Sequence, residues 1–276
     1  MGRRIYLCAD DYGIAPGVNA AIRDLVLRGR LNAASVMVAA PSFHRSDAAA
    51  LEFLNVEHRR VAIGLHLTLT APFAPLSAGF RPVKDGAFMP LPAMLRRGLL
   101  RLLDARALAA EIDAQVAAFG KAFGRPPDFF DGHHHVHLLP QAREALLAAM
   151  RRFAPEAWVR QCGGLKPPRA QWKDRKAALL SLLSRGMQRR ARACGIRANP
   201  TFAGAYAYDG KADFAALMPG FLAGQEDGGV VMCHPGFVDD ELKRLDSLTF
   251  LRAKEHAYLA GEEFPRRLAE AGLTLA

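Results

Sequence analysis

The sequence has few of the features that are typical of disulfide-rich, membrane-spanning or secreted proteins. Its four cysteines form no C-x-x-C pair and no tight cluster, so we expect reduced thiols and a cytoplasmic protein rather than a disulfide framework. No apolar run approaches the roughly 20 residues of a membrane span. The apolar run near the N-terminus is broken by Asp10 and Asp11, which also argues against a signal peptide.

Nucleotide-binding signatures are also absent, since neither G-x-G-x-x-G nor G-x-x-x-x-G-K-[ST] occurs. The net charge of +10 suggests anionic partners. However, the basic residues are spread along the chain, and the densest group lies in a predicted helix over residues 171–194, where a solvated face explains it. Aromatic residues do not interleave with these charges, so nucleic acid is not the expected partner. The sequence does not determine the oligomeric state, and it is compatible with a homodimer.

Short apolar runs alternate with amphipathic segments along the 276 residues. This alternation predicts a parallel sheet flanked by helices. With about seven strands and no linker, we expect an irregular TIM-like (β/α) barrel, formed by residues 1–276 as one domain. Residues 71–92 are rich in Pro, Gly and Ala and are expected to form a long binding loop. The predicted strands are residues 5–9, 35–40, 60–70, 129–130, 157–160, 201–203, 229–233 and 273–275.

Polar segments follow four of these predicted strands. They are ADDYG (residues 9–13), GLHLTLT (64–70), DGHHHVHLLP (131–140) and MCHPGF (232–237). In a (β/α) barrel the carboxyl ends of the strands converge on one mouth, so these segments should meet there. Convergence of carboxylates and imidazoles is what a metal site requires.

The segment DGHHHVHLLP holds four of the nine histidines of the chain. A lone histidine is more often a core or surface residue than a ligand, and a His-rich run can be a cloning artefact. This run, however, lies between a predicted strand and a predicted helix that begins at Pro140. Because of the spacing, at most one or two side chains of such a run can reach one ion. Neutral imidazole is the commonest metal ligand, so we expect at least one of these histidines to bind metal.

The adjacent carboxylates of Asp10 and Asp11 would repel each other after a buried strand, and a nearby cation would compensate. Successive residues of an extended chain point to opposite sides, so the two should have different roles. An alternative is that one of them caps the helix that begins at Pro16. The pair lies several residues before Pro16, which argues against capping.

His66 and His234 are ambiguous by themselves. His66 lies within an apolar strand, where a buried, hydrogen-bonded histidine is the common case. His234 follows residues 229–233 and precedes Pro235, and we favour an acid or supporting role for it. Their position at strand ends beside the other polar segments makes a functional role for both more credible.

Together, ADDYG, GLHLTLT, DGHHHVHLLP and MCHPGF resemble, in the same order, the motifs of the YdjC/ChbG family of carbohydrate deacetylases. The resemblance covers nearly the whole chain. It implies a TIM-like barrel, a divalent metal, and removal of acetyl groups from N-acetylated sugars such as chitooligosaccharides. Gly132 stands where a serine is frequent in the family, and Tyr12 where a phenylalanine is frequent.

The resemblance also implies site residues. The family's metal ligands fall on Asp11, His66 and His133, and its catalytic base on Asp10. His234 matches a histidine at the mouth of the active site, and we expect it to act as the acid. NodB-type deacetylases instead take both histidines from one H-x-x-x-H helix. His137 lies four residues after His133 and remains a competing ligand.

Zinc suits this ligand set best, although magnesium or another divalent ion is compatible with it. The expected partner is a small carbohydrate, with the loops at residues 73–88 and 160–166 as its rim. A hopanoid-linked N-acetylglucosamine is an alternative substrate. A metal-dependent phosphoesterase, with ligands for two or three ions, and an inactive sugar- or nucleic-acid-binding protein are the alternatives from other classes.

Overall fold

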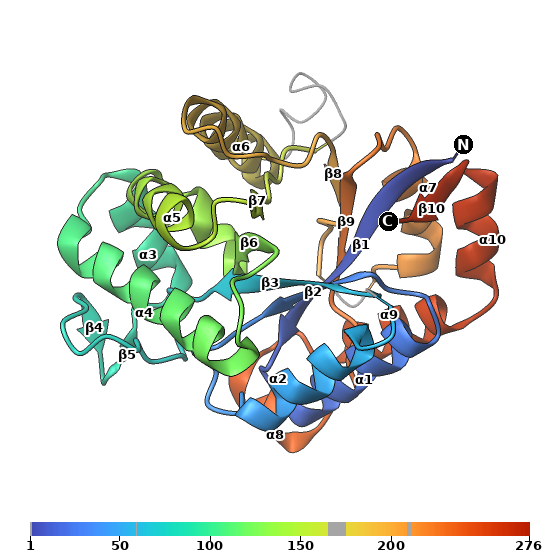
Figure 1. The fold of residues 1–276 in the computed structure, drawn as a ribbon, viewed down its shortest axis with the longest axis horizontal. Helices are drawn as coiled ribbons and strands as arrows, with labels where there is room; N and C mark the ends of the chain where they lie inside the picture. Colours follow the sequence, from blue (N-terminus) through green and yellow to red (C-terminus); the bar gives the residue numbers. More distant parts are fainter. Residues whose placement is uncertain (1, 59, 165–174, 209–210) are drawn as a thin grey trace.

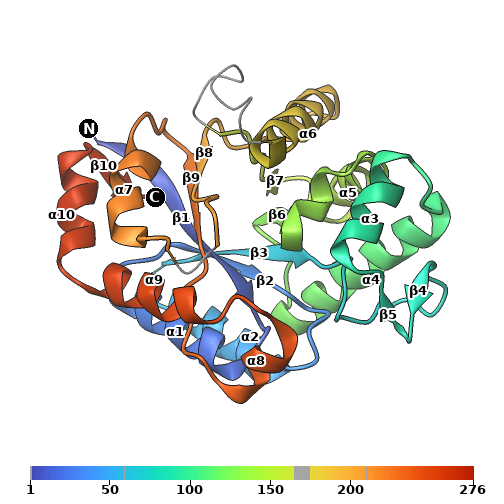
Figure 2. The same ribbon diagram turned by 180° about the vertical axis from the view of Figure 1, so that it is seen from behind.

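A computed structural model describes residues 2–58, 60–164, 175–208 and 211–276. Seven parallel strands curl into a sheet in the order β7-β6-β3-β2-β1-β9-β8, and helices surround it (Figures 1 and 2). These strands are β1 (Arg3–Tyr12), β2 (Ala33–Val36), β3 (Ala62–Leu67), β6 (Phe129–Gly132), β7 (Trp158–Val159), β8 (Phe202–Ala203) and β9 (Gly229–Cys233). An eighth strand, β10 (Leu273–Leu275), adds to the first residues of β1.

The two edges of this sheet also meet. Isolated parallel bridges join Val159 to Ala198 and Gly164 to Phe202, so the segments that carry β7 and β8 lie side by side. Around the resulting ring, each of the seven strands neighbours the next one in the sequence. The predicted irregular TIM-like barrel is therefore confirmed.

Burial explains why these segments form strands. All residues of β2, β3, β6 and β9 are buried, as expected for parallel strands covered on both faces. Glycine allows close packing between two of them, because a Cβ on Gly64 of β3 would lie 2.3 Å from the ring of Phe129 in β6. That ring stacks on Trp158 of β7, with centroids 4.5 Å apart.

The helices begin and end largely where residue chemistry predicts. Helix α1 (Pro16–Leu27) has Pro16 in its first turn and Ala15 as its N-cap, so neither aspartate of the pair caps it. Asp104 caps α4 (Ala105–Phe123), which ends at the left-handed Gly124. The others are α2 (Arg45–Glu52), α3 (Leu91–Leu99), α5 (Pro140–Phe153), α6 (Arg175–Ala193), α7 (Phe214–Leu222), α8 (Asp240–Leu245), α9 (Phe250–Ala260) and α10 (Glu263–Glu270), with the 3₁₀ turns η1 (Phe53–Asn55) and η2 (His133–Leu138).

Three local predictions need correction or completion. The strand predicted over residues 35–40 ends at Val36. The connection at residues 71–92 contains a small antiparallel hairpin of β4 (Val83–Lys84) and β5 (Ala87–Phe88). Of the helix predicted over residues 171–194, residues 171–174 lie outside the described part of the chain.

The longest helices do not form membrane spans. Within the described residues, none is both long and apolar enough to cross a bilayer.

Candidate metal centre

The paired aspartates lie at the carboxyl end of β1, where the strand is irregular. Asp11 has a φ of 69°, in the left-handed region, and the register between β1 and β2 shifts between Ala9 and Tyr12. A bulge of this kind redirects side chains at a strand end. Consequently both carboxylates come close to Nε2 of His66, Asp11 Oδ1 at 3.3 Å and Asp10 Oδ2 at 4.0 Å.

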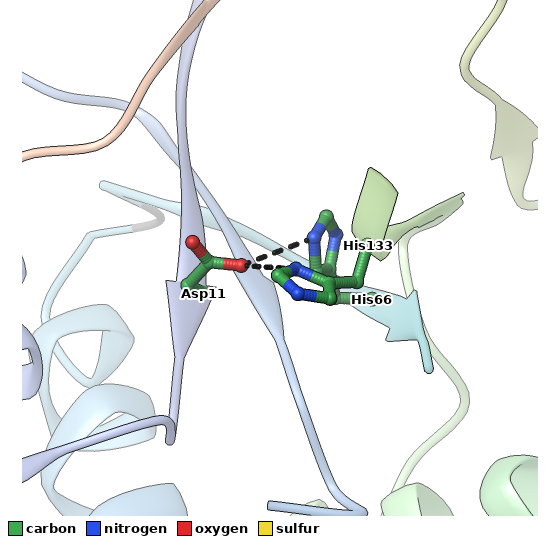
Figure 3. Close-up of side chains that lie close together, drawn as sticks. All are labelled: Asp11, His66 and His133. Carbon is green, nitrogen blue, oxygen red and sulfur yellow. Dashed lines mark hydrogen bonds and ion pairs between the residues drawn. The ribbon is translucent and has the colours of Figure 1, made fainter. Parts of the chain in front are cut away.

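Asp11, His66 and His133 form one group of potential ligands (Figure 3). Their donor atoms all lie within 4.8 Å of one another, and all three residues are buried. Oδ1 of Asp11 lies 3.3 Å from Nε2 of His66 and 3.0 Å from Nδ1 of His133. The structure therefore brings together the three residues that the sequence predicted as ligands, from β1, β3 and the start of η2.

The other ring nitrogen of His66 is held by a second carboxylate. Nδ1 lies 2.6 Å from Oδ1 of Asp131, which also accepts a hydrogen bond from the hydroxyl of Ser35. Burial by itself would lower the pKa of His66, but the charges of Asp131 and Asp10 outweigh burial and raise it to about 10. A carboxylate that accepts from Nδ1–H leaves Nε2 directed at the ion site, which is the usual support of a histidine ligand.

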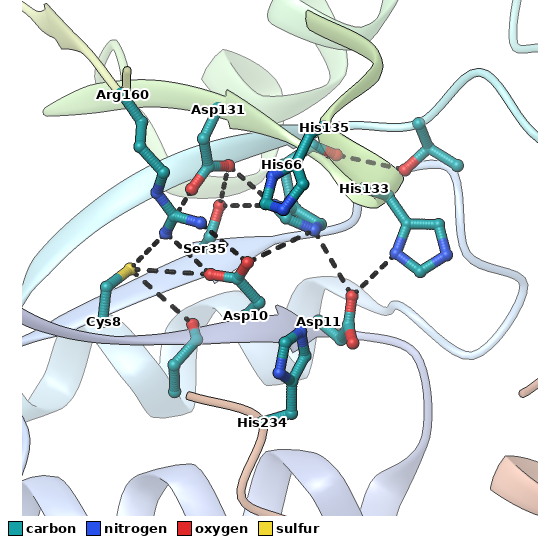
Figure 4. A network of polar contacts seen from close by, with 12 residues as sticks. Cys8, Asp10, Asp11, Ser35, His66, Asp131, His133, His135, Arg160 and His234 are labelled. Atoms are coloured by element: carbon teal, nitrogen blue, oxygen red, sulfur yellow. Dashed lines mark hydrogen bonds and ion pairs between the residues drawn. The ribbon is translucent and has the colours of Figure 1, made fainter. Parts of the chain in front are cut away.

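Asp10 has a different partner, Arg160, which follows β7 (Figure 4). The buried guanidinium of Arg160 donates to both carboxylate oxygens of Asp10, each at 2.7 Å, and lies 2.5 Å from Oδ2 of Asp131. It also lies 2.9 Å from Sγ of Cys8. Cys8, Asp10 and Asp131 form a second group of potential ligands, but Arg160 already supplies the cation there.

Asp11 is fixed through its second oxygen. Arg252 of α9 donates to Oδ2 of Asp11 at 2.6 Å and to Asp246 at 2.6 Å. Burial would raise the pKa of Asp11, but the charges of Arg252 and His133 lower it well below its usual range. Oδ1 of Asp11 thus faces the two imidazoles as an ionised carboxylate.

The charges of the site leave room for a cation. Three buried carboxylates, those of Asp10, Asp11 and Asp131, adjoin two buried guanidiniums, those of Arg160 and Arg252. Arg252 also pairs with Asp246, so the carboxylates outnumber the guanidiniums. The raised pKa of His66 reflects this excess of negative charge, because the charges of Asp131 and Asp10 favour a proton on the imidazole. A divalent ion would replace this proton, because imidazole binds metal in its neutral form. The residues therefore fit a divalent metal.

The remaining histidines of the run have other partners. Thr70 lies 3.0 Å from Nδ1 of His134, and Cys162 lies 3.5 Å from Nδ1 of His135. His137 is buried, with Nε2 3.0 Å from the backbone carbonyl of Arg160, and burial lowers its pKa well below the usual range. His137 is therefore outside the ligand group and supports the backbone of Arg160.

His234 follows β9 at the same mouth. Its backbone N–H donates to Glu255 at 2.5 Å, and the hydroxyl of Tyr208 lies 3.3 Å from Nδ1 of its ring. The other oxygen of Glu255 accepts from the hydroxyl of Tyr206. Burial lowers the pKa of His234, although the charges of Asp11 and Asp10 act in the direction that raises it.

Sequence reasoning missed several residues of this network. Asp131 opens the His-rich segment at a strand end, a signal that could have identified it. Arg160 ends a predicted strand, but it was assigned to a substrate rim. Arg252 and Glu255 lie on α9 without any motif, so no local signal marks them. In the first predicted rim loop, Phe80 and Phe88 are buried in the core, whereas the buried ring of Phe73 lies edge-on to His133, with ring centroids 5.7 Å apart. Residues 165–166 of the second rim loop lie outside the described residues.

Several solved structures share this fold. A protein from Enterococcus faecalis V583, named for cellobiose-phosphate cleavage, superposes with a TM-score of 0.75 at 22% identity, covering 100% of this chain and 97% of that one. A lactam utilization protein from Thermus thermophilus gives a TM-score of 0.51 at 17% identity, covering 99% and 98%. At these identities the likeness concerns the fold.

Sequence relatives carry more specific information. Chitooligosaccharide deacetylases of Yersinia pestis bv. Antiqua (strain Angola) and Yersinia pseudotuberculosis serotype O:1b (strain IP 31758) are each 31% identical over 153 residues. This match covers 55% of the chain and 57% of each relative, so it spans little more than half of their length. The pattern of the YdjC-like proteins, by contrast, matches residues 4–270. The chain therefore belongs to the YdjC-like protein family.

Proposed function

We propose that this protein is a metal-dependent deacetylase that hydrolyses the acetamide group of N-acetylated sugars. The observation that carries the proposal is the buried group of Asp11, His66 and His133, with Asp10 beside it. Two further facts support it: the family membership, and the name of the relatives that share 31% identity over about half of their length.

Asp11, His66 and His133 would hold the ion. One carboxylate and two imidazoles leave coordination positions open, which is typical of catalytic sites, and these donor types favour zinc. When bound, such an ion supplies Lewis-acid activation of water and of the acetyl carbonyl. The second group of potential ligands, Cys8, Asp10 and Asp131, is already occupied by the guanidinium of Arg160. The described residues therefore offer one ion site, which argues against the phosphoesterase alternative.

Asp10 is the proposed general base. Its carboxylate lies beside the ion site, 4.0 Å from Nε2 of His66, and both its oxygens are fixed by Arg160. A base in this position takes the proton of the attacking water. Arg160, which donates to both oxygens, would hold this carboxylate in one orientation.

His234 is the proposed acid. An amine is a poor leaving group, so its nitrogen must receive a proton as the C–N bond breaks. The ring of His234 lies at the mouth of the barrel and has a lowered pKa, so in its protonated form it gives up a proton readily. The hydroxyl of Tyr208 is in position to orient this ring.

The proposed substrates are oligomers of N-acetylglucosamine, with a lipid-linked N-acetylglucosamine as the alternative. Release of free amine from such oligomers, measured with the purified protein with and without zinc, tests the proposal. Asp10→Asn and His133→Ala should both abolish release, the first with zinc still bound and the second with zinc binding lost. The control His135→Ala should retain most of the activity.

The outcomes separate the parts of the proposal. If one zinc ion binds tightly but no N-acetylated sugar is deacetylated, the ion site stands and the activity is wrong. If amine release persists in Asp10→Asn, Asp10 is not the base.

A further inference from the structure

The net charge of the protein is concentrated on one side. Helix α3 with the turn that follows it (residues 91–103), α5 and α6 contain twelve basic residues and one acidic residue. Their net charge of +11 compares with +10 for the whole chain, so the remainder is nearly neutral. We call these three segments the basic face.

The three segments are neighbours in space. Helix α5 packs against both α3 and α6, and Figures 1 and 2 show them together beside the barrel. On one flank of α5, Arg101 pairs with Glu144 at 2.8 Å. On the other flank, a Cβ on Gly186 of α6 would lie 2.4 Å from the guanidinium of Arg143. The turn after α3 and the middle of α6 therefore adjoin the same part of α5.

The basic side chains crowd one another. The pKa of Arg143 is lowered by burial and by the charges of Arg190, Arg101 and Arg189, against the opposing charge of Glu144. Among the described residues, no carboxylate pairs with four exposed arginines of α6, Arg185, Arg189, Arg190 and Arg192. A cluster of uncompensated like charges costs folding free energy, which an anionic partner would offset.

Exposed leucines accompany these charges. Leu100 and Leu102, in the turn after α3, are 62% and 59% exposed, and Leu182 of α6 is 58% exposed. Large apolar side chains at this exposure on a basic face are typical of interfacial membrane binding. A nucleic acid would neutralise the arginines but would offer no apolar layer to the leucines. A second copy of the chain docked by the same face would bring arginines against arginines.

We propose that the basic face docks on a membrane surface that contains anionic lipids. The arginines of α6 would contact the phosphate headgroups, and Leu100 and Leu102 would enter the boundary of the acyl chains. This surface borders the candidate metal centre, because η2, which begins with His133, is in contact with both α5 and α6. Docking would bring the mouth of the barrel close to the lipid, whether or not the proposed deacetylase activity is correct.

Co-sedimentation with vesicles tests the proposal. The protein should sediment with vesicles of phosphatidylglycerol and phosphatidylcholine, and stay in solution with phosphatidylcholine alone. Arg189→Gln with Arg190→Gln should weaken binding more than tenfold, since each charge contributes roughly fivefold. Leu100→Ser with Leu102→Ser should weaken it in low salt as well, where attraction between charges is strongest.

Matched controls lie elsewhere on the molecule. Lys254→Gln with Arg266→Gln removes two exposed charges from α9 and α10, and Leu27→Ser with Val56→Ser removes two exposed apolar groups. Both should sediment like the unaltered protein, with unchanged melting temperatures for all variants. Equal binding to both vesicle types would overturn the proposal. The proposal would also be overturned if the leucine variant bound vesicles as tightly as the unaltered protein and duplex DNA bound equally well. Such a result would indicate a general site for polyanions.

Discussion

At the scale of single residues, the carboxylates of Asp10 and Asp11 differ because of their partners. Arg160 holds Asp10, whereas Arg252 holds one oxygen of Asp11 and leaves the other facing two imidazoles. The left-handed backbone at Asp11 brings both carboxylates to the same side of the chain end. These different partners are consistent with the different roles predicted for the two residues, although their backbone is bulged rather than extended.

Asp131 should control metal affinity without touching the metal. Asp131→Asn removes the charged acceptor of His66 Nδ1–H, so the affinity for zinc should fall roughly 10- to 100-fold. Competition with a chromogenic chelator measures this affinity. Asp128→Asn, directly before the same strand, is the control and should leave the affinity unchanged. An unaltered affinity in Asp131→Asn would contradict the supporting role of this carboxylate.

Glu255 should make stability depend on pH. Burial raises its pKa from 4.5 to about 7, despite hydrogen bonds from Tyr206 and His234 that favour the charged form. Between these two pH values the folded protein keeps a proton that the unfolded chain has released. The free energy of unfolding should therefore fall as pH rises through this window, by up to about 1.4 kcal/mol per pH unit.

Denaturant unfolding at several pH values, for the unaltered protein and for Glu255→Gln, measures this contribution. The stability of the unaltered protein relative to Glu255→Gln should decrease from pH 4.5 to about pH 7 and be constant above it. The exposed Glu226→Gln is the control. A pH-independent difference between the unaltered protein and Glu255→Gln would show that Glu255 is ionised throughout.

At the scale of elements, strand packing sets the position of His66. Gly64 lies two residues earlier in β3, and a Cβ there would overlap the Phe129 ring of β6, which stacks on Trp158. Gly64→Ala should therefore lower the free energy of unfolding by about 1–3 kcal/mol. Gly120→Ala, in α4, is the matched control because nothing lies within 4 Å of its Cβ position; it should be neutral or stabilising. Equal stabilities of the two variants in chemical denaturation would contradict the close packing of β3 and β6.

Most elements could be predicted because strands buried on both faces are largely apolar and because several helices, such as α1, α4 and α5, begin with Pro or Asp. The strands at residues 229–233 and 273–275 have the predicted bounds. The hairpin at Val83–Phe88 could not be predicted, since two-residue strands have no measurable periodicity. Buried phenylalanines in residues 73–88 looked like a rim because sequence alone does not distinguish an aromatic loop from a core.

At the scale of the whole molecule, the proposed ion would join β1, β3 and the start of η2 across the mouth of the barrel. An ion that binds only the folded state stabilises it by about 2.7 kcal/mol at a hundredfold excess over its Kd. The melting temperature of chelated protein should therefore rise with added zinc, and His66→Ala should show a much smaller rise. Equal melting temperatures with chelator and with zinc would contradict a site that uses these three elements.

The candidate site was predictable in part for a physical reason. Its ligands are rare, chemically distinctive residues at the ends of strands, and the barrel brings strand ends together. The arginines that support it lie on α9 and after β7, far from the histidines in sequence. Arginine is common in this chain, so only the three-dimensional structure separates Arg160 and Arg252 from the surface arginines.

The central claim is that one ion at Asp11, His66 and His133 is required for deacetylation. The most direct test is amine release from N-acetylglucosamine oligomers while zinc is added back to chelated protein. Our account predicts that activity rises in proportion to zinc and reaches its maximum at one ion per chain, with no recovery in His133→Ala. Full activity in the chelated protein, or recovery in His133→Ala equal to that of the unaltered protein, would contradict it.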